Sequence, residues 1–149
     1  MQRFKNKKTR FAYTVSILFV LLFVYAASSK LFDYQQFRIQ LGQSPVLTAY
    51  ADWVAWSVPL VEYLLAFGLI LERTRLKALY GSFALMIMFT TYIILVLKFS
   101  DYIPCSCGGV LEDLGWTEHI IFNMVFILLA ATAIRCLEVE GTTKKILAS

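Results

Sequence analysis

Two cysteines separated by a single residue are the most reactive groups in this sequence. Cys105 and Cys107 follow Pro104 and precede two glycines, a composition that favours a tight, irregular turn over a helix. In an oxidising compartment, two thiols this close are expected to form a disulfide with each other or with a partner. The small ring of a Cys-x-Cys disulfide is strained, which makes the bond easier to reduce. The pair therefore indicates thiol–disulfide exchange.

The same pair has two alternative interpretations. The first is a structural disulfide that pins its loop, and the second is part of a metal site. A zinc centre usually takes four ligands, and His119 is the obvious nearby addition, so we expect no metal. The third cysteine, Cys136, lies at the far end of an apolar segment and is too distant to resolve a bond at the pair.

Two polar residues follow the cysteines along the chain. His119 and Asn123 are four positions apart, which places them on one face of a helix. With an ordinary pKa of about 6.5, a histidine here would shuttle a proton or lower the pKa of a nearby thiol. The alternative is a histidine at the membrane interface with its polar end in water.

Glu62 is the only charged residue in the middle of an apolar segment. A carboxylate in lipid is costly, so we expect it to face the bundle interior and to have a partner. Lys30 and residues 90–92 (Thr, Thr and Tyr) are the candidate partners. Pro59, one turn earlier, removes a backbone hydrogen bond and predicts a kink. Glu62 is interpreted either as a structural polar contact or as a group that handles protons or binds a ligand.

The elements that position these residues are apolar helices. The chain has 149 residues, of which 59% are hydrophobic and 16% charged, and a mean hydropathy of +0.67, which argues against an ordinary soluble domain. A helix crosses a hydrocarbon core of about 30 Å with about 20 residues. We predict an all-α, polytopic bundle of four transmembrane helices in one membrane domain, residues 1–149, with spans at about 11–31, 53–71, 78–97 and 119–135.

The first of these spans also fits a cleaved signal peptide, because it has a basic start and small residues at its end. Its apolar run exceeds the usual signal core of about 7 to 15 residues, which favours a retained helix. The following loop brings apolar residues back at helical spacing over residues 32–41, so we predict a short amphipathic helix at the interface. Tyr50, Trp53 and Trp56 are expected to anchor the chain at the same level.

The positive charges predict the orientation. Five of the fourteen basic residues lie in the first ten positions, and others cluster in the 72–77 turn and near the C-terminus. Both termini are therefore expected in the cytoplasm, with loops 32–52 and 98–118 outside. The net charge of +4 is interpreted as a membrane anchor and not as a nucleic-acid surface. We predict a multi-pass protein of the bacterial inner membrane with its cysteine loop on the periplasmic side.

Several short segments together resemble the MauE/DoxX-like family of redox-associated, four-span membrane proteins. The resemblance covers most of the chain and is carried by the segments Lys30–Asp33, Pro59–Glu62, Gly68–Leu71 and Ile103–Gly109. Members of the methylamine utilisation type are associated with maturation of a disulfide-rich periplasmic dehydrogenase subunit, and others accompany thioredoxin-like or envelope proteins. The resemblance maps the family's Cys-x-Cys, glutamate and lysine onto Cys105, Cys107, Glu62 and Lys30. Many members have an aromatic residue and then glycine after the second cysteine, whereas two glycines follow here.

The group is also similar to four-helix, quinone-linked thiol oxidoreductases of the vitamin K epoxide reductase and DsbB type. That similarity implies a membrane quinone as a candidate cofactor. Those enzymes usually carry a second, shuttle cysteine pair, which this sequence lacks on its outer side. Electrons would therefore pass directly to a quinone or to an envelope partner with thiols or disulfides, either thioredoxin-like or Cys-rich.

Three hypotheses about function follow. The first is a membrane thiol–disulfide oxidoreductase acting through Cys105 and Cys107. The second is a non-enzymatic assembly or accessory subunit in which these cysteines form a structural disulfide. The third is a small transporter or metal-handling protein that uses Glu62 as its coupling carboxylate.

Overall fold

The computed structural model describes residues 7–43, 47–99 and 115–147, and nearly all of them are helical. Four helices in these ranges are long and apolar enough to cross a membrane, and the same ranges contain no strand. The predicted all-α, four-span architecture is confirmed. Cys105 and Cys107 lie outside the described residues. The elements in chain order are α1 (Lys7–Phe32), α2 (Tyr34–Gly42), a 3-10 turn η1 (Thr48–Tyr50), α3 (Ala51–Ile70), α4 (Arg75–Phe99) and α5 (Trp116–Leu147).

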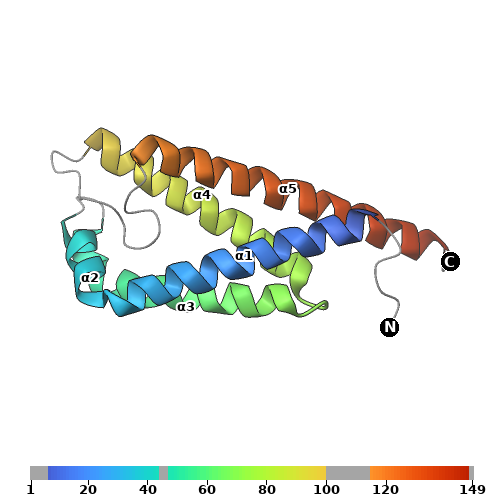
Figure 1. Cartoon of the computed structure of the whole chain (residues 1–149), viewed down its shortest axis with the longest axis horizontal. Helices are drawn as coiled ribbons and strands as arrows, with labels where there is room; N and C mark the ends of the chain where they lie inside the picture. Colours follow the sequence, from blue (N-terminus) through green and yellow to red (C-terminus); the bar gives the residue numbers. More distant parts are fainter. Residues whose placement is uncertain (1–6, 44–46, 100–114, 148–149) are drawn as a thin grey trace.

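The four long helices form two closely packed pairs, α1 with α3 and α4 with α5 (Figure 1). In this view the pairs meet near the chain termini and diverge toward the opposite end, where α2 lies across α1 and α3. We call these two ends of the bundle the terminal end and the α2 end. Both termini lie at the terminal end, and their expected position in the cytoplasm stays a prediction.

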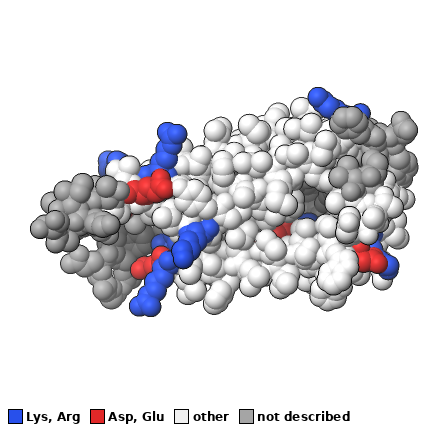
Figure 2. All heavy atoms as spheres, turned by 180° about the vertical axis from the view of Figure 1, so that it is seen from behind, with Lys and Arg blue, Asp and Glu red and all other residues white. Residues whose placement is uncertain are grey.

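The core of the bundle is built from alanine, aliphatic and phenylalanine side chains. Phe19 and Phe23 of α1 are fully buried, and the Phe19 ring meets Phe126 of α5 edge to face, with centroids 5.1 Å apart. Such contacts fix the register of two helices beyond what area burial alone provides. The outer faces are equally apolar, and Figure 2 shows an almost entirely white middle region between charged ends. This is the surface that a hydrocarbon solvent requires.

The loop after the first span contains the short helix that its periodicity predicts. Helix α2 buries Phe37 and Leu41 against Ala51 and Ala55 of α3, while Ile39 points away from the protein. The aromatic residues expected to anchor this region, Tyr50, Trp53 and Trp56, are largely exposed. The helix thus covers the α2 end of the α1–α3 pair.

The connection between α3 and α4 is held by side-chain caps. The hydroxyl of Thr74 donates to the carbonyl of Gly68 at 2.8 Å, and Arg75 donates to the carbonyls of Leu69 at 3.2 Å and Ile70 at 3.4 Å. The last carbonyls of a helix have no partners within it, so these bonds satisfy them. The guanidinium of Arg75 also lies 5.1 Å from the centre of the Tyr13 ring. Although the sequence suggested only a surface charge here, Arg75 is buried.

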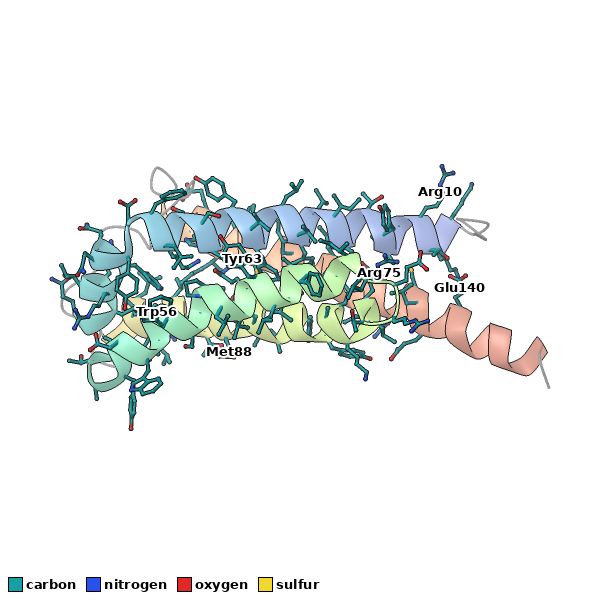
Figure 3. All side chains as sticks on the ribbon, turned by 90° about the horizontal axis from the view of Figure 1, so that it is seen from below. Arg10, Trp56, Tyr63, Arg75, Met88 and Glu140 are labelled. Carbon is teal, nitrogen blue, oxygen red and sulfur yellow. The ribbon has the colours of Figure 1, made fainter. Side chains whose placement is uncertain are left out.

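Helix α5 runs further than the apolar segment that predicts it. The predicted span ends near residue 135, whereas the helix continues to Leu147 and projects beyond the other helices at the terminal end (Figures 1 and 3). Two hydroxyl groups tether the extension, since Thr9 donates to Glu140 and Tyr80 donates to Glu138. Hydrogen bonds from α1 and α4 therefore support this polar part of the helix.

Candidate functional site

A buried ion pair joins α1 and α3 in the half of the bundle nearer α2. The ammonium nitrogen of Lys30 lies 2.9 Å from Oε1 of Glu62, whose side chain has no exposed surface. Lys30 is in the last turn of α1 and also donates to the carbonyl of Ala26 at 3.3 Å. A cation is favoured at this position because the C-terminal carbonyls of a helix carry partial negative charge.

Two aromatic rings complete the surroundings of the Lys30 ammonium. Its nitrogen is 5.9 Å from the ring centre of Phe37 in α2 and 5.7 Å from that of Phe89 in α4. Both distances are within the range of cation–π attraction, about 6 Å. One side chain thus contacts three other helices, and its lost hydration is replaced by a carboxylate, a carbonyl and two ring faces.

The structure selects Lys30 among the candidate partners of Glu62. The hydroxyls of Thr90 and Thr91 donate to carbonyls of their own helix, each at 2.8 Å, instead of reaching Glu62. Tyr92 packs beside α2. The same two helices share a neighbouring contact that the sequence does not reveal, a 2.8 Å hydrogen bond between the hydroxyls of Ser28 and Tyr63. No sequence signal would have identified it, because both residue types are common on membrane helices.

Asn123 brings a further polar group into the bundle from α5. Its side chain is buried, and its Nδ2 atom has no hydrogen-bond partner among the described residues. The same is true of the second carboxylate oxygen of Glu62. Phe126, three residues along α5, contacts Phe19, so Asn123 lies about 4.5 Å further toward the α2 end than that ring pair.

His119 begins the same face of α5. Its imidazole is half-buried, and the Asn123 side chain on the same face is buried in the bundle. The predicted polar strip of His119 and Asn123 therefore faces the half of the bundle that contains the Lys30–Glu62 pair. In Figure 2 a blue and a red group are visible at depth in a hollow of the otherwise white middle region.

The chain connectivity relates this polar group to the cysteines. Segment 100–114, which carries Cys105 and Cys107, connects α4 to α5 in the sequence, and the end of α4 and the start of α5 both lie at the α2 end of the bundle. Gly115 comes immediately after this segment, and its carbonyl accepts a hydrogen bond from the backbone N–H of His119 at 3.0 Å. On the face of α5 that carries both His119 and Asn123, His119 is thus the first polar side chain after the cysteine segment.

Within the part of the chain that the structure describes, the buried polar atoms do not form an open site for a quinone. Glu62 and Asn123 have almost no accessible surface, so a ring could not lie against them without displacing the side chains around them. Among the described residues, no group of three acidic, histidine or cysteine side chains is placed to hold a metal ion.

Comparison with known proteins identifies a family. Residues 8–135 match the family described as methylamine utilisation protein MauE. No curated protein and no solved structure matches the chain. The matched region contains parts of all four membrane-spanning helices, the Lys30–Glu62 pair and the segment with Cys105 and Cys107.

Proposed function

The chain belongs to the MauE family of membrane proteins, and from this premise we propose that it exchanges thiols and disulfides with an envelope protein through Cys105 and Cys107. One observation carries the proposal. The segment with both cysteines lies within the family match and is attached at the α2 end of the bundle, and Lys30, Glu62 and His119 lie in the half of the bundle nearer that end. Four of the described helices are long and apolar enough to cross a membrane, and we infer that the segment with both cysteines lies at the surface of that membrane.

The chemistry needs two successive exchanges. The thiolate of one cysteine attacks a disulfide of the partner, forming a mixed disulfide and releasing one partner thiolate, which takes up a proton. The thiolate of the second cysteine then attacks the mixed disulfide, which closes the Cys105–Cys107 bond and releases the partner as a dithiol. Two electrons pass to the partner, and the same steps in reverse oxidise it.

His119 supplies the proton transfer in this proposal. The thiolate is the attacking species, so a base must take the thiol proton and return one to the leaving sulfur. A histidine suits this task near neutral pH, and His119 lies one helical turn after Gly115, the residue that follows the cysteine segment. The Lys30–Glu62 pair has a positioning role, because it fixes α1 to α3 beneath the same end of the bundle.

The proposed partner is an exported protein with reactive cysteines, either thioredoxin-like or Cys-rich. We place the exchange on the periplasmic face of a bacterial inner membrane, which is the compartment where disulfides persist. A small, strained Cys-x-Cys disulfide suits transfer to such a partner, since strain makes a bond easier to reduce.

Trapping of the mixed disulfide tests this function. Cys107→Ala leaves Cys105 without its resolving thiol, so a covalent adduct to an envelope protein should accumulate on non-reducing gels and vanish on reduction. Cys105→Ala is the reciprocal variant, and Cys136→Ala, at the other end of the bundle, is the matched control that should behave as wild type. The variant with both Cys105→Ala and Cys107→Ala is the negative control. If neither single variant yields an adduct that this double variant lacks, the proposal fails.

The second candidate function is that of an accessory subunit without redox activity. The contacts of Lys30 favour this function, because they join α1, α2, α3 and α4 and so make the bundle rigid. Under this reading Cys105→Ser with Cys107→Ser lowers the stability of the protein but leaves the activity of its partner intact. Loss of partner maturation at unchanged protein level would instead support exchange.

A further inference from the structure

A shallow polar pocket lies outside the polar group described above, on the surface of the α2 end. It has a volume of about 330 Å³ and is formed where α2 meets the start of α3. Its polar lining includes Gln35 and Arg38 from α2, Thr48 from the 3-10 turn and Asp52 from α3. The pocket is open at the protein surface, and its lining contains a positively and a negatively charged side chain.

Arg38 and Asp52 form an exposed ion pair across this pocket. The guanidinium donates through Nε to one carboxylate oxygen and through Nη2 to the other at 3.1 Å. The two side chains are 46% and 66% exposed, respectively, so each keeps donor or acceptor capacity for a further group. A cation and an anion stand side by side with no net charge.

Asp52 also heads a lipid-facing stripe of α3. Trp56, Leu60, Leu64 and Phe67 follow it at spacings of four, four, four and three residues, and each is between 59% and 65% exposed. These spacings keep the side chains on one face of the helix. From Asp52 to Phe67 the stripe is about 22 Å long. It offers an uninterrupted apolar path that leads directly away from the charged pocket.

The aromatic residues place the pocket at headgroup depth. Trp56 lies one turn from Asp52, and its ring is 5.8 Å from the ring of Tyr34 in α2. Trp53 is the most exposed large hydrophobic side chain of α3. Tryptophan and tyrosine are enriched where the hydrocarbon meets the polar headgroups. The ion pair therefore stands at the level where a phospholipid carries its own charges.

We propose that this pocket binds the headgroup of a zwitterionic phospholipid with a primary ammonium group, of the phosphatidylethanolamine class. The lipid phosphate accepts hydrogen bonds from Arg38, and the lipid ammonium donates to Asp52, which matches both charges at once. The acyl chains lie along the α3 stripe. A phosphocholine headgroup has no N–H to donate, and an anionic glycerol headgroup has no cation to place beside Asp52.

Lipid competition on the full-length protein tests this binding. The protein is equilibrated with equal amounts of phosphatidylethanolamine, phosphatidylglycerol and phosphatidylcholine with identical acyl chains, and the retained lipids are measured by native mass spectrometry. We expect about fivefold enrichment of the ethanolamine lipid over the glycerol lipid, the factor that about 1 kcal/mol gives. Equal retention of the three lipids overturns the proposal.

A single substitution reverses the expected preference. Asp52→Asn removes the anion and leaves Arg38 alone, so the preference should change from the ethanolamine lipid to the anionic glycerol lipid. A merely misfolded protein would not gain a new preference. Arg73→Gln removes an exposed arginine at the opposite end of the bundle and should change nothing. An unaltered preference in Asp52→Asn contradicts the assignment of this pocket.

Free phosphoethanolamine separates a lipid site from a site for a soluble molecule. Because the stripe contributes acyl-chain contacts, the soluble headgroup should displace the lipid only at far higher concentration than the intact lipid does. Displacement at equal concentration would assign the pocket to a soluble phosphoethanolamine compound and overturn the lipid proposal.

Discussion

The ammonium of Lys30 and the carboxylate of Glu62 meet at 2.9 Å although 32 residues separate them in the chain. This contact links the last turn of α1 to the middle of α3, and the rings of Phe37 and Phe89 extend it to α2 and α4. A buried pair of this kind is tolerated only while both charges are present, because each one is the main compensation for the lost hydration of the other.

Loss of the lysine should therefore destabilise the bundle strongly. Lys30→Met leaves Glu62 buried without its cation, and we expect the free energy of unfolding to fall by about 3 to 5 kcal/mol. Denaturant titration of the detergent-solubilised protein, followed by tryptophan fluorescence, measures the change. A loss below about 1 kcal/mol would mean that the pair is not maintained in the membrane protein.

Removal of both charges is the matched control for this substitution. In Lys30→Met with Glu62→Gln no uncompensated charge remains, and we expect most of the lost stability to return. If this double variant instead unfolds as readily as Lys30→Met alone, packing of the lysine stem, and not its charge, holds the helices together.

The sequence predicts where the helices lie along the chain better than it predicts which face of each helix is buried. Hydropathy and length locate the four spans, because lipid selects apolar segments regardless of how they pack. In lipid both the inner and the outer face of a helix are apolar. The amphipathic pattern that distinguishes these two faces in soluble proteins is therefore absent. Phe19 is buried and Leu21 is exposed, yet both are apolar. Glu62 and Lys30 were identifiable only because charge in an apolar segment needs a partner.

Other parts of the site depend on geometry that no local pattern encodes. Arg75 looked like one of several cytoplasmic charges, whereas it caps α3 across the turn. The buried position of Asn123 depends on the register between α1 and α5, which the contact of Phe19 with Phe126 establishes. Both features arise from contacts between helices, so reading one segment at a time could not reveal them.

Substitution of Arg75 should weaken the α3–α4 connection. Arg75→Ala leaves the carbonyls of Leu69 and Ile70 without these donors, at a cost of about 1 to 3 kcal/mol. Arg73→Ala is the matched control, because Arg73 is exposed in the same turn, and should change stability by less than about 0.5 kcal/mol. Thermal unfolding compares the variants, and equal midpoints would contradict the capping role.

Close packing of α3 on α4 should depend on Gly68. A Cβ atom added there would lie 3.1 Å from the Cβ of Ala78, so a larger side chain forces the helices apart. We expect Gly68→Leu to cost about 1 to 3 kcal/mol. Gly141→Ala, at an open position of α5, should be neutral or stabilising by up to about 1 kcal/mol. A neutral Gly68→Leu variant would show that α4 can move aside freely.

The orientation of the bundle can be tested with the three cysteines themselves. The positive charges predict that the terminal end, with Cys136, faces the cytoplasm, whereas Cys105 and Cys107 face outward. A membrane-impermeant maleimide applied to reduced, intact spheroplasts should label single-cysteine variants at 105 or 107. The variant that keeps only Cys136, which is half-buried, should react only after permeabilisation. Labelling of Cys136 in intact spheroplasts, with protection of the other two, would invert the orientation. Exchange with a periplasmic partner would then be impossible, because its thiols and the Cys105–Cys107 pair would be on opposite sides of the membrane.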